Sequence, residues 1–468
     1  MLALLIATPA SGAAPLEEFQ ANLRSFLKQR CLKEADVGLM ITSLQRGDVL
    51  FEANAGKLLI PASNIKILTA AAALDRLHSD YTFKTWLATD GVKNGRVLQG
   101  NLYLVGGGDP SLVPEQLWLL AQKVRTLGID MITGGLYYDD SYFDDTPYVR
   151  GWDGASAEAY HAPINALSLN FNIITLHAYP ADQPRRLARV ILEPESRYVE
   201  ILNSVTTGPA GGTPNIVVSS RRNGDQEILE VSGSLPLGSP SYQLRRAIID
   251  PARFTAATFR EYLLLQGTRI FGETSRRTLP KHVAVLVRHD SKPLSTIIAD
   301  LNKFSNNFVA EQLLKNLGAE QFGPPGSTAK GVRAVAAFLA RLGLAETEFR
   351  IADGSGLSTF NRLSARVLVR VLRTMFNDFE VLPEFMGSLG IVGADGLVQR
   401  RLQGTEAERN LRVKTGTLAG ASSLSGYARA ANKELLAFAY IVNGGPCGHA
   451  QLRQLQNRLS LMLVKFSR

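Results

Sequence analysis

A serine and a lysine three residues apart, Ser63 and Lys66, stand at the start of an apolar stretch at residues 60–74 (IPASNIKILTAAAAL). An α-helix repeats every 3.6 residues, so this spacing places both side chains on one helix face. Pro61 and Ser63 are typical of a helix start, and the small and aliphatic residues behind them are typical of a helix buried on all sides. Burial lowers the pKa of a lysine, and a neutral amine can take the proton of a neighbouring hydroxyl. The pair is therefore a candidate for nucleophilic serine chemistry.

The spacing alone does not establish this chemistry, because chance also produces it. Ser25 and Lys28 show the same spacing, as do Ser327 and Lys330. Serine is also a common N-terminal cap of helices. A capping serine followed by an unrelated lysine therefore stays open at this point as the alternative for the first pair.

Two further short motifs carry groups suited to the same chemistry. Ser305 and Asn307 lie in NKFSNNFVAEQLL, a stretch with helical periodicity, and Lys414 opens the sequence KTGT on a predicted strand. Gly416 in that strand leaves room for another backbone to approach. Each motif has an ordinary structural explanation, because Ser-x-Asn recurs at residues 168–170 and a lysine on a strand is common. The three motifs in this order carry more weight than any one of them.

Length, composition and charge limit the classes of protein to consider. The chain has 468 residues, a net charge of +9, and ordinary hydrophobic and charged contents of 45% and 20%. Such a length predicts two or three domains. The positive charge favours an acidic partner, but basic residues occur only in short pairs such as those at 221–222 and 400–401, without interleaved aromatics. We therefore expect general surface basicity and no nucleic-acid partner.

The sequence offers little for a metal or a nucleotide. Two cysteines, Cys31 and Cys447, cannot form a four-thiolate zinc site or an iron–sulfur cluster. Six histidines without the H-E-x-x-H spacing argue against a metallohydrolase. The glycine run at 106–108 lacks the G-K-[ST] ending of a phosphate loop and the G-x-G-x-x-G spacing of a dinucleotide site, which favours a structural turn. No cofactor is expected.

The first residues, MLALLIATPASGAAP, are apolar and then small, which is typical of an export signal, although the usual basic start is missing. We expect residues 1–14 to be a signal segment and the protein to be exported, to a periplasm or another extracytoplasmic location. No other apolar run is long enough to cross a bilayer, so no stable membrane span is expected.

The two ends of the chain have the periodicity of one α+β domain. Near the N-terminus, DVGLMITSL and VLFEA, joined by QRGD, predict a hairpin, and the helix that carries Ser63 follows. Near the C-terminus, residues 410–444 predict three alternating strands, and HAQLRQLQNRLSLMLVKF predicts a final helix. We expect an antiparallel sheet with the N- and C-terminal helices on the same face, interrupted by a long insertion.

The three motifs, which begin at Ser63, Ser305 and Lys414, together resemble those of the penicillin-binding proteins and serine β-lactamases. The 242 residues between the first two motifs, with GNLYLVGGGDPSL, APINALSLNFN, ADGSGLS and SLGIVGADG, make the chain similar to one subgroup. That subgroup is the class C low-molecular-mass penicillin-binding proteins, the D-alanyl-D-alanine carboxypeptidase/endopeptidases of peptidase family S13.

This resemblance implies a multidomain α+β fold. A β-lactamase/transpeptidase-like domain, with an antiparallel five-stranded sheet flanked by helices, would be interrupted by two nested β-rich domains. The implied boundaries are residues 15–82 and 286–468 for the transpeptidase-like domain, 83–171 and 238–285 for domain II, and 172–237 for domain III.

The resemblance also implies roles in cleaving a D-alanyl peptide bond. Ser63 would attack the carbonyl carbon and form an acyl-enzyme, which water then resolves. Lys66 would be the base, and the nearby cation Lys414 would help keep it neutral. Ser305 would relay a proton to the leaving amine, and Asn307 would hydrogen-bond the amide carbonyl of the substrate.

Substrate binding follows from the same resemblance. The backbone N–H groups of Ser63 and Thr417 would form the oxyanion hole, with donors aimed where charge develops. Lys414, Thr415 and Thr417 would hold the terminal carboxylate of the substrate, along the strand on which Gly416 lies.

Recognition of the stem-peptide side chain departs from the family pattern. Family members often carry a basic residue directly after DGSGLS, where it can meet the free carboxylate of diaminopimelate. Here that position is Thr359, and Arg362 follows three residues later. Asp153, in RGWDG, is a candidate for the amino end of that side chain, with a solvated loop aspartate as the alternative. The residue recognised at the third stem position stays open.

The implied fold also predicts a disulfide. Cys31 precedes the first strand and Cys447 follows the last, and these two strands pair antiparallel in this fold. The pairing brings the two cysteines together, and an exported protein permits the bond.

We therefore expect a serine DD-peptidase that acts on peptidoglycan stem peptides, as carboxypeptidase, endopeptidase or both, and that β-lactam antibiotics acylate. A serine β-lactamase is the enzymatic alternative, although the long insertion is unnecessary for it and no added deacylating glutamate is evident. A catalytically silent peptidoglycan-binding protein is the other alternative, and the complete set of motif residues counts against it. The sequence leaves the oligomeric state open.

Overall fold

The computed structural model describes residues 14–149 and 158–468. The chain forms two compact units, each described here by itself. The first comprises Met1–Asp75, Ile298–Ser305 and Val335–Arg468, and the second comprises Arg76–Ile297 and Asn306–Ala334. The finer boundaries of three domains stay a prediction. Among the described residues, no helix has both the length and the apolar character needed to cross a membrane.

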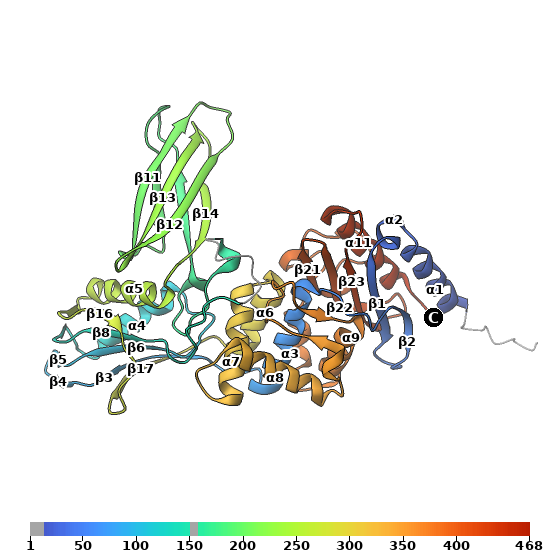
Figure 1. Ribbon diagram of the computed structural model, residues 1–468, viewed down its shortest axis with the longest axis horizontal. Coiled ribbons are helices and arrows are strands. Elements are labelled where there is room, and N and C mark those ends of the chain that lie inside the picture. The colour runs from blue at the N-terminus through green and yellow to red at the C-terminus, as the bar shows by residue number, and fades with distance from the viewer. Residues whose placement is uncertain (1–13, 150–157) are drawn as a thin grey trace, which may run out of the picture. The chain divides into compact units, whose positions relative to one another are not determined.

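An antiparallel sheet forms the centre of the first unit (Figure 1). Its strand order is β2-β1-β23-β22-β21-β20, and every neighbouring pair is antiparallel. The five strands expected from the sequence are present, and the two-residue β20 adds a sixth strand at one edge. The bounds are β1 (Asp36–Ser43), β2 (Val49–Ala53), β20 (Gly390–Ile391), β21 (Leu411–Leu418), β22 (Ala421–Arg429) and β23 (Leu435–Asn443).

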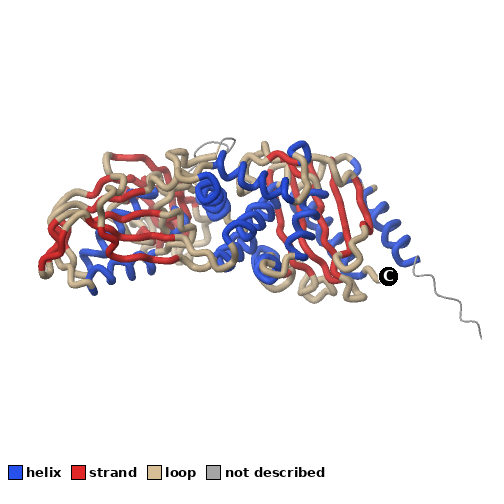
Figure 2. The backbone as a smooth tube through the Cα atoms, turned by 90° about the horizontal axis from the view of Figure 1, so that it is seen from below, coloured by secondary structure: helices blue, strands red, loops and turns tan. Residues whose placement is uncertain are grey.

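Helices cover both faces of this sheet (Figure 2). On one face, α1 (Ala14–Leu27) and α11 (His449–Lys465) share an apolar core with alternate residues of the strands, such as Ile41 and Phe438. The predicted placement of the terminal helices on one face is therefore confirmed. On the other face, α9 (Ala365–Asn377) contacts β1, β22 and β23.

The predicted disulfide between Cys31 and Cys447 is present. Cys31 lies in the short helix α2 (Arg30–Lys33), just before β1, and Cys447 follows β23. The first residue of β1 is paired with the last residue of β23, and the two cysteine Cα atoms are 5.4 Å apart. The antiparallel pairing of β1 and β23 thus brings together two cysteines that are 416 residues apart in the sequence, and the disulfide joins them.

Two of the motifs lie at helix ends, and here the structure corrects the sequence reading. The stretch NKFSNNFVAEQLL is divided, because α6 (Leu294–Phe304) ends before Ser305 and α7 (Asn307–Phe322) begins after Asn306. Ser305 has a positive φ of 56°, and the Asn306 side chain caps α7 by accepting the Val309 N–H at 3.2 Å. The remaining α-helices near the motifs are α3 (Ile65–Leu77), α8 (Thr328–Arg341) and α10 (Leu382–Ser388).

The second unit contains two larger sheets packed with helices α4 and α5 around one apolar core. Their strand orders are β16-β8-β6-β3-β17 and β15-β7-β5-β4. In the glycine run that follows β6, the N–H groups of Gly107 and Gly108 donate to backbone carbonyls at 2.9 Å, as in a structural turn. The bounds are β3 (Lys84–Thr89), β4 (Val92–Asn94), β5 (Val97–Gln99), β6 (Leu102–Gly106), β7 (Met131–Ile132), β8 (Leu136–Asp139), β15 (Arg269–Ile270), β16 (Thr274–Arg276), β17 (Ala284–Asp290), α4 (Pro114–Thr126) and α5 (Pro251–Leu265).

Two three-stranded sheets complete the second unit, which gives the insertion its expected β-rich character. In one of them β13 pairs in parallel with β11 and antiparallel with β12. In the other, β9 lies between β10 and β14. The bounds are β9 (Ile173–Tyr179), β10 (Arg189–Glu193), β11 (Val199–Gly208), β12 (Asn215–Asn223), β13 (Gln226–Pro236) and β14 (Tyr242–Ala247).

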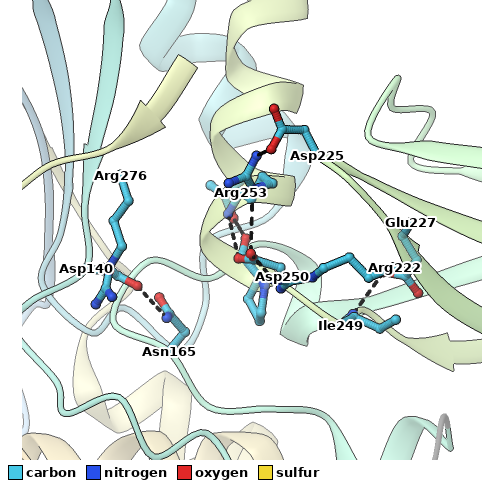
Figure 3. A network of polar contacts seen from close by, with 11 residues as sticks. Asp140, Asn165, Arg222, Asp225, Glu227, Ile249, Asp250, Arg253 and Arg276 are labelled. Carbon is cyan, nitrogen blue, oxygen red and sulfur yellow. Dashed lines mark hydrogen bonds and ion pairs between the residues drawn. The ribbon is translucent and has the colours of Figure 1, made fainter. Parts of the chain in front are cut away.

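A polar network joins the end of β12 and the start of β13 to helix α5 (Figure 3). Asp250 caps α5 and accepts a hydrogen bond from Arg222 at 2.9 Å. Arg253, in the first turn of α5, pairs with both Asp250 and Asp225. Glu227 is fully buried beside this network, and burial raises its pKa to about 7. Paired charges thus fasten the small sheet to the helix.

Candidate active site

Ser63 lies in a single 3₁₀ turn, Ala62–Asn64, directly before α3. The sequence predicts a helix start at Pro61 and Ser63, but the regular helix begins two residues after the serine. Ala62 has a positive φ of 47°, a conformation that costs energy for a residue with a Cβ atom. Behind the turn, every residue from Ile65 to Leu74 is buried, as expected for a helix surrounded by protein.

Lys66 points back along the helix toward the serine. Its side chain is fully buried, and its Nζ donates a hydrogen bond to the Ser63 Oγ at 3.0 Å. The same amine donates to the backbone carbonyl of Ser355. The hydroxyl and the amine therefore form a direct pair, held inside the protein.

Lys414 and Ser305 form a second pair of the same kind in the first unit. The Lys414 Nζ donates to the Ser305 Oγ and to the Thr415 carbonyl, each at 2.8 Å. Burial lowers the pKa of Lys414 well below its ordinary value, and the charge of Lys66 lowers it further. Burial and the neighbouring Lys66 charge therefore both disfavour the protonated form of Lys414.

The strand β21 presents Lys414, Thr415, Gly416 and Thr417 in sequence. Thr417 is exposed, and Thr415 is half-buried. A Cβ atom on Gly416 would lie 2.9 Å from the Pro61 carbonyl oxygen and 3.0 Å from the Ser63 nitrogen. The expected close approach of another backbone is confirmed, and that backbone is the turn that carries Ser63.

Asn307 is the first residue of α7 and belongs to the second unit. Its side-chain amide donates to the Tyr160 carbonyl at 3.2 Å. Tyr160 also lies in the second unit, so this contact fixes the Asn307 side chain within that unit.

A loop at residues 353–358 supports the Ser63 turn, and the sequence analysis assigned it no role. The Asp353 carboxylate accepts the backbone N–H groups of Gly356 at 2.8 Å and Ser358 at 2.7 Å. Gly356 has a φ of 83°, and a Cβ atom there would lie 2.0 Å from the Ala62 carbonyl oxygen. The loop therefore packs directly against the turn while its Ser355 carbonyl accepts from Lys66. The D-G-S-G sequence, an aspartate followed by glycines, is the signal of a tight turn that could have identified it.

Of the two residues predicted to meet the substrate side chain, the structure describes only Arg362. Arg362 lies in β19 (Arg362–Leu363), which pairs with β18 (Phe349–Arg350), and its guanidinium donates to the Thr359 and Asn361 carbonyls at 2.6 and 2.8 Å. Asp153 lies outside the described residues.

Comparisons with known proteins find relatives over nearly the whole chain. The model of the D-Ala-D-Ala carboxypeptidase 3 (S13) family matches residues 19–465. A D-alanyl-D-alanine carboxypeptidase of Actinomadura sp. (strain R39) is 33% identical over 484 aligned residues, which cover 100% of this chain and 88% of that protein. The D-alanyl-D-alanine carboxypeptidase DacB of Haemophilus influenzae is 26% identical, with 95% of each chain covered.

Solved structures show the same fold. The crystal structure of penicillin binding protein 4 (dacB) from Haemophilus influenzae matches with a TM-score of 0.84 and 24% identity, over 95% of this chain and all of that one. A complex of that protein with a β-lactam matches with a TM-score of 0.79 over the same shares of the two chains.

Proposed function

The chain belongs to the D-Ala-D-Ala carboxypeptidase 3 (S13) family and is a serine-type DD-peptidase, and on this premise we propose that Ser63 is its nucleophile. Peptidoglycan stem peptides ending in D-alanyl-D-alanine, and D-alanyl cross-links, are the proposed substrates. The function rests most directly on one observation. A fully buried lysine amine lies 3.0 Å from a serine hydroxyl at the start of a helix.

Acylation begins when the Ser63 Oγ attacks the carbonyl carbon of the penultimate D-alanine. The Oγ–H proton passes to the Lys66 amine, which needs its neutral form for this step. The repulsion between Lys66 and Lys414 favours a state in which one of the two amines has lost its proton. Negative charge then develops on the carbonyl oxygen, where the backbone N–H groups of Ser63 and Thr417 receive it.

The second half of the reaction breaks the C–N bond and releases the amine. Ser305 is proposed to relay a proton to the leaving nitrogen: it gives its hydroxyl hydrogen to that nitrogen and is reprotonated by the proton that Lys66 took from Ser63, so Lys66 is neutral again. The leaving nitrogen becomes the amino group of free D-alanine or of the second stem peptide. The Ser305 hydroxyl accepts a hydrogen bond from Lys414 at 2.8 Å, and this leaves its own hydrogen available for donation. Water then attacks the carbonyl carbon of the acyl-enzyme and gives a proton to the neutral Lys66 amine, and this proton returns to the Ser63 Oγ as the ester bond breaks.

Substrate binding is assigned to β21 and α7. Lys414, Thr415 and Thr417 hold the terminal carboxylate, and the Asn307 amide meets a carbonyl of the stem peptide. Arg362 and Asp153 are proposed for the side chain at the third stem position.

Further proposals concern ligands and location. The related Haemophilus influenzae protein forms a complex with a β-lactam, and we infer that β-lactams acylate Ser63 of this chain as well. Since the substrate is a wall polymer, the proposed location is extracytoplasmic, reached with the N-terminal segment as export signal. A net charge of +9 suits an anionic wall polymer.

The decisive experiment gives the purified protein a mixture of pentapeptide monomers and cross-linked muropeptide dimers, and identifies the products by mass spectrometry. We expect loss of one D-alanine from monomers, splitting of dimers into monomers, or both. The Ser63→Ala variant should form neither product. The ratio of the two products measures the balance between carboxypeptidase and endopeptidase activity.

Failure would have a clear form. If the folded wild-type protein releases no product from either substrate, the DD-peptidase proposal is wrong. Rapid turnover of a β-lactam by the same preparation would then favour a β-lactamase, and binding of muropeptides without turnover would favour a peptidoglycan-binding protein.

A further inference from the structure

A buried hydroxyl lies directly behind the turn that carries the nucleophile. Ser423, on β22, is fully buried, and its Oγ donates to the Pro61 carbonyl at 2.6 Å. The same Oγ accepts a hydrogen bond from the side-chain amide of Asn64, which is also fully buried. Pro61 and Asn64 flank the two residues Ala62 and Ser63. One hydroxyl therefore holds both ends of the turn.

Gly416 makes room for this hydroxyl. Strand β21 is paired with β22 so that Gly416 lies opposite Ser423. A Cβ atom on Gly416 would lie 2.3 Å from the Ser423 Oγ, a distance that no side chain tolerates. The absence of a side chain at Gly416 therefore leaves the space that the Ser423 hydroxyl occupies, where the sheet contacts the turn.

The neighbouring residue on the same strand carries the other proposed oxyanion donor. Thr417 follows Gly416, and it is opposite Ser422 in the same antiparallel register. Ser423 is therefore bonded to the Ser63 turn while its strand is hydrogen-bonded to the strand of Thr417. The Ser423 hydroxyl thus connects the turn that carries the Ser63 N–H to the strand next to the one that carries the Thr417 N–H.

We propose that Ser423 is a positioning residue that sets the distance between the two N–H groups of the oxyanion hole. This inference rests on the proposed function, because it assigns a role only if those two groups receive the developing charge. Ala62 needs such support, since its positive φ of 47° is unfavourable for a residue with a side chain. Without the Ser423 bond, the turn can relax toward an ordinary helical conformation and carry the Ser63 N–H with it.

Helix α11 holds Ser423 in place from the other face of the sheet. The Gln456 amide donates to the Ser423 carbonyl at 3.1 Å and to the Ser422 hydroxyl at 2.9 Å. Arg401 donates in turn to the Gln456 side chain at 3.1 Å. The strand that carries the hydroxyl is therefore fixed by side chains that do not touch the turn.

The same strand provides a matched control. Ser425 lies two residues further along β22, so its side chain is on the same face as that of Ser423. It is equally buried, but its hydroxyl makes no hydrogen bond within the described residues. Replacing either serine by alanine removes one buried oxygen from the same strand, and only Ser423→Ala removes the connection to the turn.

The experiment compares Ser423→Ala and Ser425→Ala with the wild type in stopped-flow acylation by a fluorescent penicillin. We expect Ser423→Ala to lower the maximal acylation rate by about 10- to 100-fold, since a small displacement of an oxyanion donor has effects of that order. The apparent dissociation constant of the first complex should stay within about twofold, because the carboxylate contacts on β21 are unchanged. Ser425→Ala should acylate within about twofold of the wild type.

A general structural effect would give a different result. If both variants slow acylation equally, or if folded Ser423→Ala acylates as fast as the wild type, the positioning role is wrong. Circular dichroism and thermal unfolding identify folded samples. If Ser423→Ala does not fold, Ser423→Cys decides, because a thiol is a weaker donor of similar volume. An acylation rate below that of the wild type in folded Ser423→Cys supports the role, and a wild-type rate overturns it.

The failure of this inference is distinguishable from failure of the proposed function. A reactive wild type with an equally reactive Ser423→Ala variant rejects only the role of Ser423. A folded wild type that neither penicillin nor a D-alanyl peptide acylates rejects the proposed function, and the role of Ser423 falls with it.

Discussion

Two of the three segments with the Ser-x-x-Lys spacing, at the starts of α8 and α3, make entirely different contacts. At the start of α8, the Ser327 Oγ accepts the backbone N–H of Lys330 at 3.2 Å, as a helix cap does. The Lys330 amine donates to the carbonyls of Gly323 and Pro325 at 2.6 and 2.8 Å. At the start of α3, by contrast, the lysine amine donates to the serine hydroxyl itself, at 3.0 Å.

The difference lies in what surrounds each segment. Ser63 lies in a 3₁₀ turn ahead of its helix, and its hydroxyl faces the Lys66 amine. Lys66 is fully buried, whereas Lys330 is only half-buried and satisfies loop carbonyls. Equal spacing therefore places two side chains on one face, and the packing around them decides whether the serine caps a helix or contacts the lysine amine.

Replacing the serine should separate the two segments most strongly. Ser63→Ala removes the proposed nucleophile, so neither penicillin nor peptide should acylate the protein. Ser327→Ala should retain activity and lose about 1 kcal/mol of stability, because only a cap is lost. Intact-mass measurement after penicillin treatment, together with urea unfolding, checks both results. A penicillin adduct on Ser63→Ala would contradict the assignment.

Replacing the lysine should give the next largest effect. Lys66→Met keeps the length of the buried side chain and removes the proposed base, so the acylation rate should fall by about 10²- to 10⁴-fold. Lys330→Met should acylate at the wild-type rate. Stopped-flow acylation of the two variants, each shown to be folded by circular dichroism, makes the comparison. Equal rates in both would mean that the 3.0 Å contact of Lys66 has no catalytic role.

A substitution in the loop that packs against the Ser63 turn should have a smaller effect, and a second glycine with a similar φ serves as its control. Gly356→Ala places a Cβ atom where the Ala62 carbonyl now lies, at a φ of 83°, so the turn must move. We expect the acylation rate to fall by about tenfold or more, since misplacement of reacting groups by about 1 Å can cost 10²-fold. Gly343→Ala has a similar φ of 78° but open space around the added atom.

The Gly343→Ala variant therefore isolates the cost of the backbone conformation. This variant should be about 1 kcal/mol less stable than the wild type and should keep the wild-type activity. Thermal unfolding and acylation rates of the two variants give the answer. A loss of activity in Gly343→Ala as large as in Gly356→Ala would show that strain alone, and not contact with the turn, is responsible.

Much of the fold could be predicted from the sequence where one local pattern controlled the result. The strict alternation in residues 410–444 fixes which side chains enter the core, and β21, β22 and β23 follow it. The run of small residues behind Lys66 likewise predicts a buried helix. The disulfide followed once the register of β1 and β23 was implied by the family.

The parts that sequence could not provide depend on contacts between distant segments. The Ser63 turn is shaped by Gly356 and Ser423, about 290 and 360 residues further along the chain, and no local pattern encodes that. The break at Ser305 was missed because helical periodicity continues across it, while the Asn306 cap starts a new helix. The Ser355 carbonyl has no side-chain signature at all, since any residue supplies one.

The smallest predicted effect concerns Lys414, the buried lysine on β21, and the dependence of stability on pH. Burial and the nearby Lys66 lower the pKa of Lys414 in the folded state below the ordinary 10.5, so the unfolded chain binds more protons in the interval between the two values. Stability should therefore rise as the pH increases through that interval and be lost as the pH falls through the folded-state pKa. Lys414→Met lacks this contribution. The difference in free energy of unfolding, wild type minus variant, should increase from pH 7 to pH 10, by at most about 1.4 kcal/mol per pH unit.

Urea unfolding of both proteins at pH 7, 8, 9 and 10, at one salt concentration, measures that difference, and the titrations common to both cancel. The slope reports Lys414 together with Lys66, because removing one ammonium group also relieves the other. A difference that stays flat or decreases with pH would mean that Lys414 stays charged in the folded protein without cost. The repulsion proposed to free a proton-accepting amine beside Ser63 would then be absent, and the 3.0 Å contact would lack an explanation of how Lys66 reaches the neutral form that the proposed reaction needs.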